Sequence, residues 1–252
     1  MNYRLWFVGS IFLMLTACGG GSSGDGSGTT TPPSVANYTK AGGSWNGQTT
    51  TDGIAGFEFV RGVISERGDG VFFSIGAIYV ITSVSGVDGN ATLTFTAYAL
   101  QGYVFSDGST VSAGTFEGVV VERDSITGSW STASGDSGSL SVEYHADYDI
   151  DSSLAILAGI YSNDYEGTVV IDPDGSFFMQ DVNGCTLNGV AGEIDTNYNL
   201  YDMSFDITNC GDANSHVTGY VSHFANGNNE RIEVIGASNL GFVFYTSFFQ
   251  YN

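Results

Sequence analysis

Basic residues are scarce in this 252-residue sequence. It contains 6 Lys and Arg against 27 Asp and Glu, which gives a formal net charge of −21 at pH 7. A surface this acidic repels the phosphate backbone of nucleic acids and anionic lipid headgroups. The composition therefore excludes nucleic acid as a partner. It fits either plain solubility or a positively charged partner, such as a basic protein or calcium.

Proline is also scarce, with 3 residues, and the patterns that begin and end helices are nearly absent. Short runs of alternating character are common instead. In 91–98, Leu93, Phe95 and Ala97 share one face and threonines share the other, and 139–145 repeats the arrangement. Asp-Gly and Asn-Gly dipeptides separate such runs. This pattern predicts an all-β chain folded as an antiparallel sandwich or barrel.

One segment differs from the rest. Residues 151–159 combine polar capping candidates, a compact apolar stretch and a final glycine, which predicts one short helix. This helix would divide the body into a first β repeat at 41–150 and a second at 151–252.

The two parts of the body share short motifs in the same order, which indicates a duplication. The matched pairs are 43–47 with 159–163, 68–73 with 173–178, and 115–119 with 186–190. We therefore expect two tandem antiparallel β-meander or barrel-like repeats joined by one short helix. The sequence leaves open whether the repeats form one barrel or sandwich, or two.

The last strand, within 241–251, is apolar on both faces. At an exposed edge it would promote aggregation, so we expect it inside a sheet, where it closes a barrel or sandwich. A barrel that spans the outer membrane is the competing interpretation.

No apolar run is long enough for a membrane-spanning helix, which needs roughly 20 residues. The longest N-terminal run is 5–15, preceded by Arg4 and followed by small residues up to Cys18. A short basic region, a short apolar region and small residues at a cleavage point are typical of an export signal.

The residues Leu15-Thr16-Ala17-Cys18 resemble the lipobox of bacterial lipoproteins. The resemblance implies a signal peptide at 1–17, lipidation of the Cys18 thiol and a mature chain that begins there. Gly19, where some members have Asp, resembles the members sorted to the outer membrane. Residues 18–40 would be the lipidated cysteine and a flexible tether. Its part rich in Gly, Ser and Thr, residues 19–34, would span roughly 20–25 Å. The alternative is an ordinary signal peptide whose cysteine is incidental.

Removal of 1–17 leaves five basic residues against 27 acidic ones, a formal charge of −22. It also leaves Cys185 and Cys210 once Cys18 carries lipid. In an exported protein such a pair predicts a structural disulfide.

Three apparent sites are weaker. Gly135-Asp136-Ser137-Gly138 matches a serine-protease motif, but His145, His216 and His223 all follow Ser137, whereas in trypsin-like enzymes the histidine comes before the serine. A hairpin turn explains these residues fully.

A metal set of His216, His223, Cys185 and Cys210 lacks the close ligand pairs of zinc sites. The two histidines are seven residues apart and would lie on opposite faces of a strand, so we expect surface or half-buried histidines. Asp172 and Asp174 are weak calcium candidates, because no third acidic ligand follows at the required spacing. We expect no cofactor.

Tyr161, Tyr165, Tyr198 and Tyr201 lie in polar surroundings. They either pack on neighbouring strands or form an exposed rim suited to protein or sugar contact.

Gly-x-aromatic strands such as 114–118 and 128–130 resemble those of tandem β-barrel surface lipoproteins of the transferrin-binding-protein type. The likeness lies in the residue pattern of the strands. It includes no ligand-contacting residue and implies no transferrin binding. We expect a non-enzymatic binding or structural module, held at the membrane by its lipid, with a protein or glycan partner. The alternatives are a periplasm-facing inhibitor or immunity-type protein against a basic hydrolase or toxin, and an enzyme that acts on envelope polymers with converging carboxylates.

Overall fold

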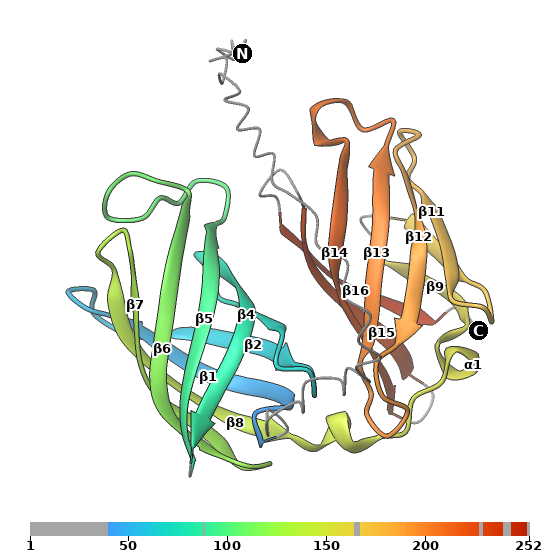
Figure 1. Cartoon of the computed structure of the whole chain (residues 1–252). Helices are drawn as coiled ribbons and strands as arrows, with labels where there is room; N and C mark the ends of the chain where they lie inside the picture. Colours follow the sequence, from blue (N-terminus) through green and yellow to red (C-terminus); the bar gives the residue numbers. More distant parts are fainter. Residues whose placement is uncertain (1–39, 88, 164–166, 227–228, 239–242, 251–252) are drawn as a thin grey trace, which may run out of the picture. The chain divides into compact units, whose positions relative to one another are not determined.

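The computed structural model describes residues 40–87, 89–163, 167–226, 229–238 and 243–250. The expected signal peptide at 1–17, Cys18 and the tether up to residue 39 lie outside the described residues. Within the described part, strands dominate and fall into two closed antiparallel barrels of eight strands each (Figure 1). The predicted all-β fold of two tandem repeats is confirmed, and each repeat is a barrel of its own.

Barrel 1 is an up-and-down barrel in which each strand pairs with the next and the last pairs with the first. Its strands are β1 (Gly43–Thr51), β2 (Glu58–Ile64), β3 (Gly70–Phe73), β4 (Ala77–Val87), β5 (Asn90–Ala99), β6 (Val111–Val121), β7 (Ser125–Thr132) and β8 (Ser137–His145). Antiparallel pairing of β1 with β8 closes the ring.

Barrel 2 repeats this topology. Its strands are β9 (Gly159–Asn163), β10 (Gly167–Ile171), β11 (Ser176–Gln180), β12 (Thr186–Glu193), β13 (Tyr201–Thr208), β14 (Ser215–Asn226), β15 (Asn229–Ser238) and β16 (Val243–Gln250). Strand β16 pairs with both β15 and β9, so it closes the barrel as its apolar sequence predicts.

A short connection links the barrels. It contains the 3-10 helix η2 (Ala146–Asp149) and the α-helix α1 (Leu154–Leu157). Another 3-10 helix, η3 (Gly211–Ala213), follows β13. The Ser153 side chain caps α1 by accepting a hydrogen bond from the backbone N–H of Ile156 at 3.2 Å. The predicted short helix is confirmed, with its polar N-cap.

Strand alternation builds the two cores. On β5, Leu93, Phe95 and Ala97 are buried, and the threonines between them are partly exposed. These side chains join a core cluster inside barrel 1 with residues such as Trp45 and Phe116. A separate cluster, which includes Tyr161 and Phe205, fills barrel 2.

The barrels correspond strand by strand, which agrees with the duplication for two of the three predicted matches. Residues 43–47 lie on β1 and 159–163 on β9, the first strand of each barrel. Phe72 and Phe177, from the second match, are both buried on the third strand.

The third predicted match is wrong. Residues 115–119 lie on β6, the sixth strand of barrel 1, whereas 186–190 lie on β12, the fourth strand of barrel 2. A glycine beside outward-facing residues suits many strands of a tightly curved sheet. Such a short pattern therefore does not identify equivalent strands.

Candidate functional site

The barrel interiors leave little room for a ligand. The cavity inside barrel 1 measures about 40 Å³ and that inside barrel 2 about 30 Å³. Small-molecule sites usually have volumes of roughly 300–1,000 Å³. Each interior is therefore a packed core without room for a ligand of ordinary size.

A larger cleft, of about 550 Å³, lies between the barrels. Strands β3 and β4 form one side, and strands β12 to β15 form the other. Small residues contribute much of the lining: Gly70, Ala191, Gly192, Gly219, Gly236 and Ala237. A Cβ added to Gly192 would meet no atom within 4 Å, so the space beside it is open.

Two carboxylates lie in this cleft, and one arginine binds both. Asp69 comes from the β2–β3 turn and Asp202 from β13. Arg67 donates from Nη1 and Nη2 to the two oxygens of Asp202, at 2.7 and 2.6 Å, and its Nη2 lies 3.3 Å from Asp69. The hydrogen bonds to Asp202 raise the pKa of Arg67. Both acids are therefore paired with a permanent cation.

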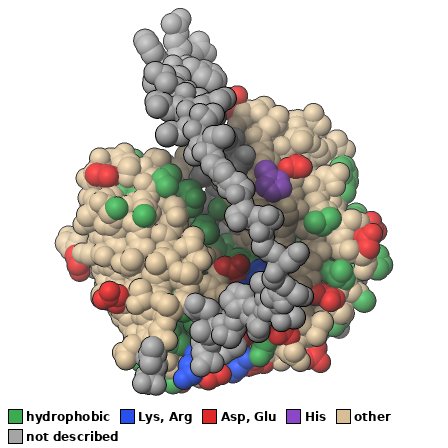
Figure 2. Space-filling model, viewed as in Figure 1, with side chains coloured by type: hydrophobic (Ala, Val, Ile, Leu, Met, Phe, Trp, Pro, Cys, Tyr) green, Lys and Arg blue, Asp and Glu red, His purple; other side chains and the backbone are tan. Residues whose placement is uncertain are grey.

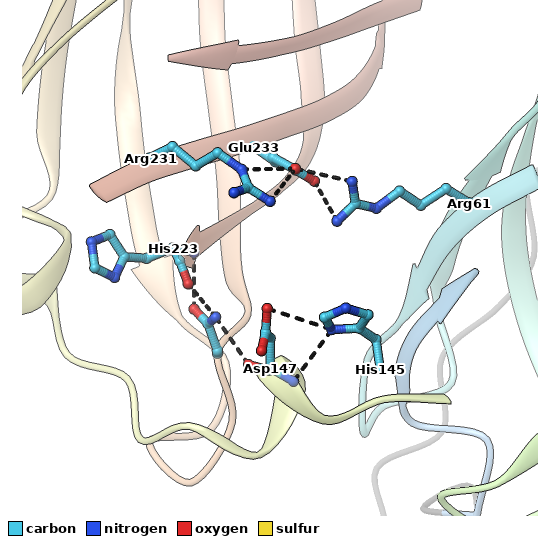
Figure 3. A network of polar contacts seen from close by, with 7 residues as sticks. Arg61, His145, Asp147, His223, Arg231 and Glu233 are labelled. Atoms are coloured by element: carbon cyan, nitrogen blue, oxygen red, sulfur yellow. Dashed lines mark hydrogen bonds and ion pairs between the residues drawn. The ribbon is translucent and has the colours of Figure 1, made fainter. Parts of the chain in front are cut away.

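A second arginine crosses between the barrels next to this cleft. Arg61 of β2 makes a two-pronged contact with Glu233 of β15, with N···O distances of 2.9 and 2.8 Å. Arg231 of the same strand also donates to Glu233, from Nε at 3.2 Å. Figure 3 shows the two guanidinium groups converging on this carboxylate. Both cations also lie over the ring of Phe224, at 5.6 and 4.7 Å from its centroid.

A third arginine joins barrel 1 to the connection and to barrel 2. Arg123, in the β6–β7 turn, donates to Asp149 and to the Tyr144 hydroxyl. Its guanidinium lies 4.9 Å from the ring of Tyr198. Tyr198 stacks on Tyr148, with ring centroids 5.1 Å apart. Cation–π and charge-assisted contacts therefore combine at one point.

Glu66 lies beside Arg123 but is poorly paired. Its Oε1 is buried without a hydrogen-bond partner, and the Arg123 guanidinium is 4.0 Å away. Burial raises the pKa of the Glu66 carboxyl, and this effect outweighs the attraction of Arg123. The ionised carboxylate is therefore a destabilising group at neutral pH.

Asn199 connects the linker to barrel 2. Its side chain donates to the backbone carbonyls of Asp147 and His223 and accepts from the backbone N–H of His223 at 2.9 Å. His223 is only 7% exposed, with Nε2 3.7 Å from Glu230. Burial lowers the pKa of His223, so the ring is held neutral.

The described arginines concentrate at the junction between the barrels. In the described part of the chain, the basic residues are Lys40 and four arginines, and the arginines are those bound above: Arg61, Arg67, Arg123 and Arg231. Figure 2 shows acidic side chains spread over both barrels, whereas the basic ones in view lie at the lower edge and at one point near the centre. The surface outside the junction is therefore more acidic than the net charge of the chain indicates.

Cys185 and Cys210 form the predicted disulfide, with their Cα atoms 4.7 Å apart. Cys185 ends the β11–β12 connection, and Cys210 is the second residue of the β13–β14 connection. The bond therefore links two neighbouring loops at one end of barrel 2. The other cysteine of the prediction, Cys18, lies outside the described residues.

Asp172 and Asp174 lie in the turn between β10 and β11. Asp174 accepts hydrogen bonds from the backbone N–H and the hydroxyl of Ser176, at 2.9 and 2.7 Å. These contacts complete a plain turn. In the described ranges, no group of three or more His, Cys, Asp or Glu is arranged to hold a metal ion.

The residues of the protease motif form the β7–β8 hairpin. Ser137 donates to Asp52 at 2.6 Å, and no histidine takes part in that contact. His216 is exposed and His223 is buried, so the prediction of opposite strand faces is confirmed. The expectation that each histidine is exposed or half-buried is wrong for His223, which is only 7% exposed.

The exposed-rim interpretation fails for two of the four tyrosines. Tyr161 and Tyr201 are fully buried, and Tyr198 is half-buried in the Arg123 contact. Tyr165 lies outside the described residues. Polar residues near these tyrosines differ in burial, since the Asp202 side chain is 44% exposed and Asn199 is buried. Polar composition alone therefore does not identify an exposed tyrosine.

Sequence reasoning missed the arginine junction and an exposed apolar surface at one end of barrel 1. Scarcity of arginine was visible in the sequence. The partners of each arginine, however, lie up to 172 residues away along the chain. No local pattern indicates such contacts.

No protein-family model matches the sequence, and no curated protein sequence matches it significantly. The structure has a likeness to a crystal structure of a candidate outer membrane protein from Bacteroides fragilis NCTC 9343. The two are 12% identical, with a TM-score of 0.30, and the match covers 84% of this chain and 98% of that one. The fold described above rests on the strand pairing of this chain and not on that likeness. Within the described residues, no helix is both long and apolar enough to cross a membrane.

Proposed function

We propose that this chain is a lipid-anchored, non-enzymatic binding protein of the bacterial outer envelope. The lipobox-like residues up to Cys18 and the tether after them support the anchor and the location. The two barrels form the binding body that the tether holds away from the membrane.

One observation carries the binding function: the free volume lies outside the barrels. The interiors hold cavities of about 30 and 40 Å³, whereas the cleft between the barrels measures about 550 Å³. Both carboxylates of that cleft are paired with Arg67, which favours recognition over acid–base chemistry. A scaffold with filled cores and a junction held by ion pairs is suited to present rigid outer surfaces.

The test is affinity capture from intact cells after chemical cross-linking. A C-terminally tagged wild-type chain should recover a specific protein or glycan that a Cys18→Ser variant, which lacks the lipid site, does not recover. Recovery of the same background by both chains would remove the support for a displayed binding protein.

A second candidate is a periplasm-facing inhibitor of a basic hydrolase or toxin. It is favoured by the concentration of the described arginines at the junction, which leaves an acidic outer surface able to attract a cationic partner. Protease added to whole cells discriminates between the two candidates. An outward-facing body is digested, and a periplasm-facing body is protected until the outer membrane is permeabilised.

A further inference from the structure

Four connections of barrel 1 meet at one end, and together they form a surface that we name the barrel 1 tip. They are the β1–β2 (52–57), β3–β4 (74–76), β5–β6 (100–110) and β7–β8 (133–136) connections. Alternate connections of an up-and-down barrel lie at the same end. The β2–β3 and β6–β7 turns, which carry Arg67 and Arg123 to the junction, lie at the opposite end.

Large apolar side chains are exposed at the barrel 1 tip and on the adjoining end of β2. They are Ile54 (67%), Phe57 (55%), Phe59 (76%), Ile75 (67%), Tyr103 (48%) and Val104 (64%). A single exposed apolar residue is ordinary on a protein surface. A group of this size at one end of a barrel is typical of an interaction surface.

Close approaches join three of these connections. The rings of Phe57 and Phe59 meet edge to face, with centroids 5.5 Å apart. A Cβ placed on Gly76 would lie 3.4 Å from the ring of Tyr103 and 4.0 Å from the Glu58 carboxylate. The β1–β2, β3–β4 and β5–β6 connections therefore adjoin one another.

Hydrogen bonds hold the connections in place without a partner. Ser106 donates to Asp136 from its hydroxyl at 2.6 Å and from its backbone N–H at 3.1 Å, which links β5–β6 to β7–β8. Ser137 donates to Asp52 at 2.6 Å, which links β7–β8 to β1–β2. A surface ordered in advance loses less entropy when it binds.

The charges at the barrel 1 tip have one sign. Asp52, Glu58, Asp107 and Asp136 lie on or beside the four connections, and no Lys, Arg or His occurs there. Barrel 2 differs at its corresponding end. In the described parts of its connections, Val182 is the large exposed apolar residue, and the Cys185–Cys210 disulfide ties two of them together.

We propose that the barrel 1 tip docks a cationic amphipathic segment of a partner protein. Apolar side chains of the partner would pack on Phe57, Phe59 and Ile75, and its Lys or Arg residues would meet the four carboxylates. The charge argues against two other occupants. Anionic lipid headgroups repel an acidic surface, and two copies of the tip repel each other. This proposal rests on the binding function proposed above and names its partner class.

The test uses a fluorescent helical peptide composed of Leu and Lys as the cationic amphipathic probe. The variant combines Phe57→Ser, Phe59→Ser and Ile75→Ser. The matched control combines Phe178→Ser and Phe249→Ser, which remove aromatic rings 48% and 53% exposed on barrel 2. Circular dichroism and thermal unfolding verify that both variants fold.

At low ionic strength the probe should bind the wild-type chain and the control equally, and the tip variant at least about tenfold more weakly. Equal binding by all three forms would overturn the proposal. So would equally tight binding of an all-Lys peptide, since that would require only the overall charge. If the wild type binds phosphatidylethanolamine–phosphatidylglycerol vesicles and the tip variant does not, the occupant of the tip is a membrane and not a partner protein. If the wild type self-associates and the tip variant does not, the occupant of the tip is a second copy of the chain.

The intact-cell capture separates this proposal from the binding function itself. If the tip variant recovers the same partner as the wild type, the binding function stands and the barrel 1 tip is not its site. If the wild type recovers no partner, the binding function fails.

Discussion

Trp45 and Tyr161 occupy equivalent places in the two barrels and make the same hydrogen bond. The Trp45 indole N–H donates to the carbonyl of Ala41, and the Tyr161 hydroxyl donates to the carbonyl of Leu157, each at 3.0 Å and each four residues back. Both side chains are fully buried on the first strand of their barrel. Each ring therefore fills a core while its polar atom secures the chain that enters the barrel.

Tyr161→Phe should destabilise the chain by about 1 kcal/mol, because it removes this hydrogen bond and keeps the ring. Urea unfolding measures the change. Tyr103→Phe is the control, since Tyr103 lies on the exposed barrel 1 tip. A Tyr161→Phe chain as stable as the wild type would mean that the repeated hydrogen bond contributes nothing.

Glu233→Gln should loosen the junction. It leaves the guanidinium groups of Arg61 and Arg231 facing a neutral amide in a place where the carboxylate is only 11% exposed. We expect a loss of about 2 kcal/mol, with faster amide hydrogen exchange in the 146–158 connection. Glu117→Gln on β6, where the side chain is exposed, is the matched control. Unchanged exchange in the connection would show that this cluster does not hold the barrels together.

Acid should weaken the fold through His223. Its pKa is lowered by burial in the folded chain, whereas an unfolded histidine titrates near 6.5. The unfolded chain therefore binds more protons below that pH, and stability should fall by up to about 1.4 kcal/mol per pH unit until the folded pKa is reached. His223→Gln should remove this part of the pH dependence, and His216→Gln should retain it. Unfolding measured from pH 7.5 to 4.5 distinguishes the two, and identical profiles would contradict the assignment.

Glu66→Gln should stabilise the fold at neutral pH. The raised pKa of Glu66 means that its ionised form is disfavoured in the folded chain. The variant should therefore be more stable than the wild type at neutral pH, and the gain should shrink as the pH falls and Glu66 is protonated. Thermal unfolding at pH 7 and pH 4 measures both effects. A less stable variant at pH 7 would show that attraction to Arg123 outweighs burial.

Removal of the disulfide should affect barrel 2 alone. The cysteines are 25 residues apart, and a loop of that length corresponds to about 3 kcal/mol in the chain-entropy model. A Cys185→Ala, Cys210→Ala chain should show faster hydrogen exchange in β12 and β13 and unchanged exchange in β5 and β6. Equal acceleration in both barrels would mean that the two unfold as one unit.

Local periodicity explains what could be predicted from the sequence. Alternation on β5 identified its buried face, and the polar cap with the short apolar stretch identified α1. Cys185 and Cys210 were paired because they are the two cysteines that remain once Cys18 is assigned to the lipid. Each of these depends on neighbours in the chain or on simple counting. The motif around Trp45 and Tyr161 also identified equivalent strands, because it includes a large buried ring.

The remaining features depend on contacts that no local pattern indicates. Arg61 meets Glu233 only when the two barrels pack against each other. Polar neighbours of Tyr201 suggested exposure, although the ring is fully buried and its neighbour Asn199 is buried as well. The barrel 1 tip could not be predicted from the sequence, because the connections that carry Ile54, Ile75 and Tyr103 come together only when the barrel closes.

The central claim is that the chain works from the outer envelope on a lipid attached to Cys18. Intact mass spectrometry of the N-terminal peptide, prepared from the membrane fraction of cells that express the full chain, tests it most directly. The account predicts a mature chain that begins at Cys18 and carries acyl groups. A chain that retains residues 1–17, or that begins elsewhere with an unmodified Cys18, would contradict it.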